Sequence, residues 1–174
     1  MRMNAMSKKI VPAEEAPENW SLDDAHICRS KLVEKCADAE FHVLALLRAR
    51  GDNSSCKTPF SRKIEALRVA ATKQKSPGKA DLKIVQLLED LLPLADLRSE
   101  LVHSTMERGA AAGRSVILFR NAAEVHRIVD RRVVLTLADL KDATQRLSDV
   151  VNQLKQLANP SSRPQPKPGA AACP

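Results

Sequence analysis

The chain has 174 residues, a formal net charge of +7, four cysteines, one tryptophan, three phenylalanines and no tyrosine. This length fits a single domain, and the lack of any apolar run near ~20 residues argues against a membrane span. No apolar run follows the basic residues Arg2, Lys8 and Lys9, so we expect no signal peptide. The cysteines lack the paired spacing of zinc ligands, and exposed aromatic side chains are too few for a base-stacking surface. We therefore expect a cytoplasmic protein without a metal or cofactor, whose positive charge suits a polyanionic partner.

The first ordered element should begin at Trp20, because residues 1–19 hold prolines, glutamates and few large apolar side chains and are expected to form a flexible arm. Ser21 and Asp24 have the spacing of a capping box. A helix over 22–50 follows, and Gly51 is suited to end it. Its apolar side chains recur at helical spacing, at Cys28, Leu32, Cys36, Val43 and Leu47.

A second, short helix should start at Thr58-Pro59, with the threonine as cap and the proline in the first helical position. It is followed by a basic loop and then by the third helix, which runs to Val102 and contains Pro93, where we expect a kink. The buried stripe of this third helix is predicted to include Ile84, Leu88, Leu91, Ala95 and Val102. Arg98 falls on the same stripe, where a polar group needs a partner.

After the third helix the pattern changes. Residues 107–114 contain two glycines, Gly109 and Gly113, and are predicted to form a loop. Residues 115–120 and 132–136 are rich in β-branched side chains and predict two strands that pair as a hairpin. Thr136 and Asp139 then form a second capping box, which starts a fourth helix that ends at Asn159.

The sequence thus predicts an all-α protein, a four-helix up-down bundle with a small β-hairpin between the third and fourth helices. Its domain is expected to span 20–159. Residues 1–19 form an arm before it, and residues 160–174 form a disordered proline-rich tail after it.

Arg98 and His103 form an R-x(4)-H pattern at the end of the third helix. An arginine can hold a phosphate group with two parallel hydrogen bonds, and a histidine with a pKa near 6.5 can take or give a proton at neutral pH. Together they suit RNA cleavage without a metal. In that reaction the histidine moves a proton and the arginine stabilises the developing charge.

The third helix, this pattern, the predicted hairpin and the last helix resemble the HEPN superfamily, over roughly residues 20–158. The motif of that superfamily is R-x(4–6)-H, which Arg98 and His103 match, and Ser104 matches a small residue after the histidine. Ser99 departs from the asparagine that is common after the arginine. The resemblance implies a helical homodimer, with two motifs facing each other in one cleft. It also implies an RNA-binding or RNA-cleaving protein of a toxin–antitoxin or other defence system, with RNA and an antitoxin as partners.

Two readings of the motif stay open. Residues five apart on a regular helix point about 140° away from each other, so the pair converges only through a helix break or a second subunit. Alternatively Arg98 pairs with an internal acid or a backbone carbonyl and His103 caps the helix, and the protein is a non-catalytic dimeric interaction module. Four basic side chains beyond the motif are candidate contacts to nucleic acid, unless they are merely solvated: Arg108, Arg114, Arg120 and Arg127.

Overall fold

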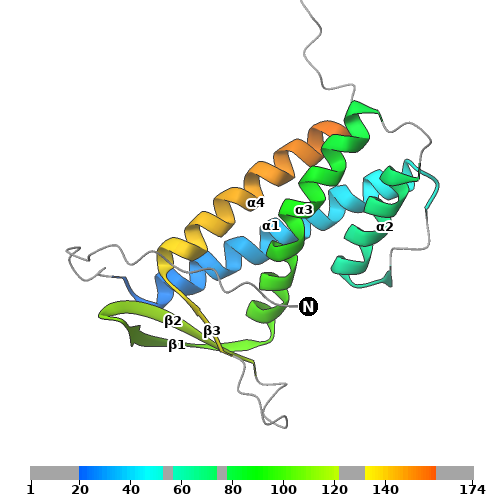
Figure 1. Ribbon diagram of the computed structural model, residues 1–174. Coiled ribbons are helices and arrows are strands. Elements are labelled where there is room, and N and C mark those ends of the chain that lie inside the picture. The colour runs from blue at the N-terminus through cyan, green and yellow to red at the C-terminus, as the bar shows by residue number, and fades with distance from the viewer. Residues whose placement is uncertain (1–19, 53–56, 74–77, 122–131, 160–174) are drawn as a thin grey trace, which may run out of the picture.

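Four helices and a three-stranded antiparallel sheet make up the fold (Figure 1), which was obtained as a computed structural model and describes residues 20–52, 57–73, 78–121 and 132–159. The elements follow the order α1 (Leu22–Arg48), α2 (Phe60–Thr72), α3 (Lys79–Val102), β1 (Ser104–Ala111), β2 (Arg114–Asn121), β3 (Arg132–Leu135) and α4 (Leu137–Ala158). The predicted arm over 1–19 and tail over 160–174 lie outside the described residues. No helix in the described ranges has both the length and the apolar character to cross a bilayer.

Both predicted capping boxes are present. The amide of Asp24 donates to Ser21 Oγ over 3.1 Å, and the amide of Asp139 donates to Thr136 Oγ1 over 3.0 Å. The start of α2 was predicted one residue too early. Pro59 occupies the cap position with an extended ψ of 153°, so helical geometry begins only at Phe60.

The first and last helices do not run antiparallel, as they would in a four-helix up-down bundle. The charge of Lys141 acts on Asp24 near the start of α1, and the charge of Lys155 acts on His42 farther along, so α1 and α4 run in the same direction. α3 runs against α1. The reason is that α2 has only 13 residues and does not serve as a full-length member, so the alternation passes from α1 to α3 to α4.

The core contains most of the apolar positions that helical spacing predicted. Leu32, Cys36, Val43 and Leu47 of α1 are each at most 1% exposed. α3 differs at its end, where Val102 is 38% exposed and Leu101 is fully buried instead. The helix continues through Pro93, and its last turns follow a different direction from its first ones in Figure 1. Because a proline bends a helix, the stripe read from the first turns no longer predicts which side faces inward at the last turn.

The sheet is larger than the predicted hairpin. β2 and β3 pair as expected, but the predicted loop after the third helix is in fact strand β1, which pairs with β2 from Ser104 opposite Asn121 to Ala111 opposite Arg114. The turn between them consists of Ala112 and Gly113, whose φ angles are 51° and 76°. Positive φ at both central residues matches the right-handed twist of a two-stranded ribbon, which explains why this glycine belongs to a tight turn.

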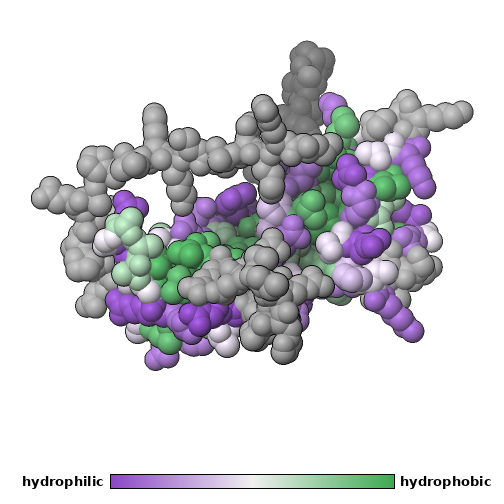
Figure 2. Space-filling view, turned by 60° about the horizontal axis from the view of Figure 1, so that its bottom comes forward, coloured by the Kyte–Doolittle hydropathy of each residue, from purple (hydrophilic) through white to green (hydrophobic). Residues whose placement is uncertain are grey.

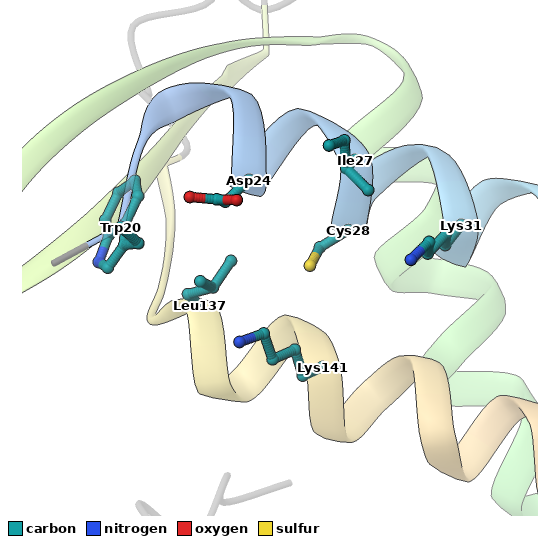
Figure 3. Close-up of a pocket in the computed structure, with 7 residues that line it drawn as sticks. All are labelled: Trp20, Asp24, Ile27, Cys28, Lys31, Leu137 and Lys141. Atoms are coloured by element: carbon teal, nitrogen blue, oxygen red, sulfur yellow. The ribbon is translucent and has the colours of Figure 1, made fainter. Parts of the chain in front are cut away.

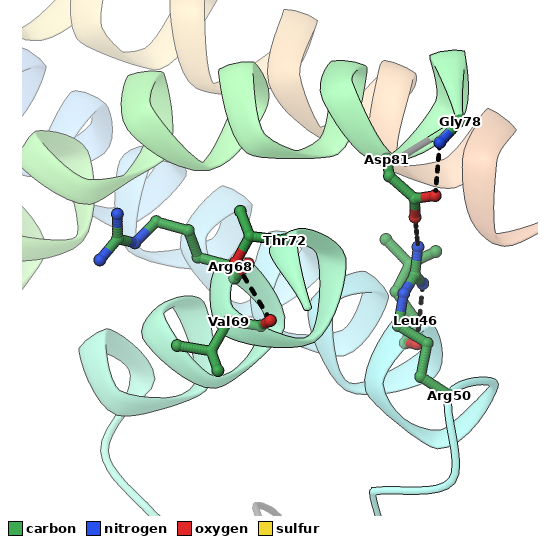
Figure 4. A network of polar contacts seen from close by, with 7 residues as sticks. All are labelled: Leu46, Arg50, Arg68, Val69, Thr72, Gly78 and Asp81. Carbon is green, nitrogen blue, oxygen red and sulfur yellow. Dashed lines mark hydrogen bonds and ion pairs between the residues drawn. The ribbon is translucent and has the colours of Figure 1, made fainter. Parts of the chain in front are cut away.

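Polar contacts attach the helices to one another at the far end from the sheet. Arg50 at the end of α1 forms an ion pair with Asp81 in the first turn of α3, and it also donates to the carbonyl oxygen of Leu46 (Figure 4). Lys63 of α2, although 5% exposed, forms an ion pair with Glu40 of α1. These pairs fix the packing of α1 against α2 and α3.

Candidate functional site

Arg98 lies half-buried in the seam between α3 and α1. Across this seam lies Cys36 of α1, whose side chain is 1% exposed and whose sulfur lies 3.9 Å from the carbonyl oxygen of Leu94. Burial raises the pKa of the Cys36 thiol to about 11, and the positive charge of Arg98 opposes that rise. The guanidinium is therefore close enough to α1 to act on a buried group across the seam.

The Arg98 guanidinium has no hydrogen bond or salt bridge to any part of the chain that the structure describes. None of its nitrogen atoms is among the buried unpaired polar atoms of the described residues, so its donors still reach solvent. The internal acid or carbonyl that a purely structural role would require is thus missing among the described residues. Its donors are available for a ligand or for another protein chain.

His103 is the first residue after α3 and is exposed to solvent. Its φ of −96° and ψ of 2° are outside the helical range, so the helix breaks at His103 itself. No hydrogen bond joins His103 to Arg98 or to any other described residue. The single chain therefore places the two motif residues near one end of α3 without a hydrogen bond between them among the described residues.

Arg29 of α1 is a site residue that the sequence did not reveal. Its Nη2 donates to the carbonyl oxygen of Val102 at 3.4 Å, one residue before His103. This places a second guanidinium at the same helix end, where the partial negative charge of the terminal carbonyl groups favours a cation. A groove of about 440 Å³ opens there, lined by Arg29, Ser30, Val33, Glu34 and Val102.

Among the basic residues of the sheet, Arg120 lies nearest the motif in the strand register, because it stands opposite Thr105, two residues after His103. Arg108 lies 4.8 Å from the centre of the Trp20 ring in a cation–π contact, and its Nε donates to Ser115 Oγ over 3.1 Å. Arg120 is paired with Glu107 at 3.6 Å. Arg114 is exposed at the β1–β2 turn, and Arg127 lies outside the described residues. Arg108 is thus engaged within the protein, and of the three candidates that the structure describes, Arg114 is the one whose exposed guanidinium has no partner.

A second hollow of about 450 Å³ lies where α1 and α4 begin (Figure 3). The thiol of Cys28 and the amines of Lys31 and Lys141 border it, together with Trp20. Hydrogen bonds from Ser21, and then the charge of Lys141, lower the pKa of the Asp24 carboxyl at its edge. This carboxylate is already used to cap α1, and the lining contains no histidine, so the hollow offers less acid–base chemistry than the end of α3.

Within the described ranges, no three His, Cys, Asp or Glu side chains come together as a metal site would require. Comparison of the chain with protein-family models, with curated proteins and with solved structures finds no match. Function must therefore be argued from the residues at the end of α3 and the groove beside them.

Proposed function

We propose that the protein is an HEPN-like RNA-binding protein that cleaves RNA without a metal, with Arg98 and His103 as its chemical pair. A toxin–antitoxin or other defence system is the setting that the resemblance implies. The observation that carries the proposal is Arg98 itself. It is half-buried at the end of α3, yet it has no hydrogen bond or salt bridge among the described residues. A planar guanidinium with free donors is suited to hold a phosphodiester through two parallel hydrogen bonds.

The chemistry assigned to His103 is proton transfer. The imidazole takes the proton of a ribose 2′-hydroxyl, and the resulting oxygen attacks the adjacent phosphorus while the bond to the 5′-oxygen breaks. The products are a 2′,3′-cyclic phosphate and a free 5′-hydroxyl, which receives the proton. Arg98 stabilises the extra negative charge on the phosphoryl oxygens during this displacement. No metal is needed, because the histidine supplies the proton transfer and the arginine the charge.

The geometry of one chain is compatible with a second copy in the active form. Arg98 lies in α3 and His103 follows the last residue of that helix, and within the described residues no hydrogen bond joins the two side chains. In a homodimer, His103 of one copy would act beside Arg98 of the other. The exposure of His103 and the free donors of Arg98 support this arrangement, because both groups are open to a partner.

The test is cleavage of a mixed RNA pool by the purified protein in EDTA. We expect the parent to cleave, His103→Ala to lose about 10²–10⁴-fold of the rate, and Arg98→Gln to be impaired as well. His26→Ala is the matched control, because His26 is exposed on α1 and its loss removes the same type of group. An active His103→Ala variant with the parental rate would contradict the proposed role of the histidine.

The alternative function, a non-catalytic dimeric interaction module of the same fold, has one observation in its favour. Three large apolar side chains of α3 are exposed: Leu82 at 61%, Leu92 at 41% and Val102 at 38%. The end of the molecule that carries the sheet also shows hydrophobic surface between hydrophilic side chains (Figure 2). Under this alternative the protein associates with itself but cleaves no RNA. Sedimentation of the parent beside Leu82→Ser and Leu92→Ser variants, together with the cleavage assay, separates the two functions.

A further inference from the structure

The groove between α1 and the end of α3 has features that the proposed cleavage chemistry does not use. Its lining combines a guanidinium, a carboxylate and two apolar side chains in a volume of about 440 Å³, a size within the usual range of small-molecule sites. We infer that this groove binds one nucleotide of a single-stranded RNA, with Arg29 holding a phosphate and Glu34 recognising the amino group of the base. The inference rests on the proposed function, which it deepens by naming what the protein selects.

Arg29 is held in place for this role by the backbone. One of its N–H groups is directed to the carbonyl oxygen of Val102, and the side chain has no other partner among the described residues. A guanidinium carries five N–H donors, so most of them remain for a ligand. Because its bond to Val102 fixes the guanidinium one residue away from His103, a phosphate bound there would lie next to the proposed scissile bond.

Glu34 lines the same groove but does not pair with Arg29. The two residues are five apart on α1, and the helical geometry turns their side chains away from each other, which leaves the carboxylate free. An ionised carboxylate only accepts hydrogen bonds. The exocyclic amino groups of cytosine, adenine and guanine can donate to it. The N–H of uracil is flanked by two carbonyl oxygens, which a carboxylate repels.

Val33 and Val102 supply the apolar part of the groove. Val102 is 38% exposed although it directly adjoins the core residue Leu101, so it leaves apolar surface open at the edge of the groove. A ribose or the face of a base can cover such a surface while its polar edge reaches Glu34. An acidic ligand without an apolar part would use Arg29 alone, whereas a nucleotide uses the guanidinium, the carboxylate and the two valines together.

The test is equilibrium binding of fluorescent single-stranded RNA heptamers of cytidine, adenosine or uridine, in EDTA, with His103→Ala as the background so that the RNA stays intact. We expect the cytidine and adenosine heptamers to bind more tightly than the uridine heptamer. Arg29→Gln should weaken all of them by about tenfold, since it removes a charge-assisted hydrogen bond. It should also reduce the slope of log K against log salt by about 0.7, the value for one phosphate contact on a single strand.

Glu34→Gln should act differently. It should leave the salt slope unchanged and reduce the preference for cytidine over uridine, because an amide can both donate and accept. Glu34 is exposed, so this variant keeps the fold even where Arg29→Gln weakens the end of α3. The matched controls are Arg48→Gln and Glu89→Gln, which remove the same groups from exposed positions outside the groove. Both controls should retain the parental base preference and salt slope.

Three results would overturn the inference, and they differ in what else they overturn. If no heptamer binds the His103→Ala background or the parent, the proposed function fails together with the inference. If RNA binds and Arg98→Gln weakens it, but Arg29→Gln and Glu34→Gln change neither affinity nor base preference, only the inference fails. If the two groove variants instead abolish self-association seen by sedimentation and leave RNA binding unchanged, the groove is a protein-docking surface.

Discussion

The Arg50 guanidinium lies 2.8 Å from the Asp81 carboxylate, and this pair joins the end of α1 to the first turn of α3. The other carboxylate oxygen of Asp81 accepts the amide of Gly78 at 3.2 Å, so a single side chain both caps α3 and binds α1. Asp81 is only 8% exposed. Because Arg98 lies near the far end of α3 and His103 directly follows that end, the attachment at Asp81 sets the register of the seam in which the candidate site lies.

Replacing Asp81 by asparagine should therefore destabilise the protein. The amide can still accept the Gly78 N–H, but it leaves the half-buried Arg50 guanidinium without its charge partner. The loss of a buried hydrogen-bond partner predicts about 1–3 kcal/mol less free energy of unfolding, measured by urea denaturation. Asp90→Asn is the control, because Asp90 is exposed on the same helix and should change stability by less than about 0.5 kcal/mol. Equal losses in the two variants would contradict the role assigned to the pair.

The β1–β2 turn offers a stabilising substitution. Ala112 has a φ of 51°, a left-handed conformation that alanine adopts reluctantly and asparagine tolerates. Ala112→Asn creates Asn-Gly, the sequence most suited to this turn, and should raise the free energy of unfolding by about 0.5–1 kcal/mol. Ala111→Asn should lower it, since Ala111 is in the extended strand, where asparagine is disfavoured. Chemical denaturation measures the change in the free energy of unfolding for each variant. A higher free energy of unfolding for Ala111→Asn would refute the conformational argument.

How much of this fold the sequence predicts depends on the range of the interactions involved. The caps at Ser21 and Thr136 were predicted because each involves residues three apart. Strand β1 was missed because glycine and alanine over residues 109–111 have no preference for strands. The segment becomes a strand because it pairs with β2. At Gly109 a Cβ would lie 2.8 Å from Leu118 Cδ1, so the glycine that suggested a loop is the residue that lets the two strands pack.

In the candidate site, too, the sequence predicted the residues that are close in the chain and missed those that only the packing of helices brings together. Arg98 and His103 were found from their spacing, and α3 ends at Val102, between the two residues. Arg29 gave no signal, because it is one of several charged residues on α1 and becomes distinct only when α1 and α3 pack antiparallel. The sequence also could not tell that Val102 would be exposed, since that depends on the bend after Pro93.

His42 should titrate below the ordinary histidine pKa of 6.5. Burial lowers its pKa, the charge of Asp38 raises it, and the charge of Lys155 lowers it further. Lys155→Gln should therefore raise the pKa of His42, and Asp38→Asn should reduce it, as followed by NMR titration of the imidazole. The unfolded chain binds the proton first, so this group makes the protein less stable as the pH falls below about 6.5. Shifts of the same sign in the two variants would contradict the electrostatic assignment.

Cys36 should make stability depend on pH at the alkaline end. Burial raises the pKa of its thiol from 9.0 to about 11, so between these values the unfolded chain loses the proton while the folded chain keeps it. Rising pH then favours unfolding, and the contribution that is fully present below pH 9.0 is lost progressively toward about pH 11. Cys36→Ala should be less stable than the parent at neutral pH, because it leaves a cavity, but its free energy of unfolding should fall less steeply between about pH 8 and about pH 10.5. The chain has no tyrosine, so phenol groups cannot produce the same slope. Urea denaturation of parent and variant at about pH 8 and about pH 10.5 measures how far the free energy of unfolding falls. An equal fall in the two proteins would show that Cys36 is not the group responsible.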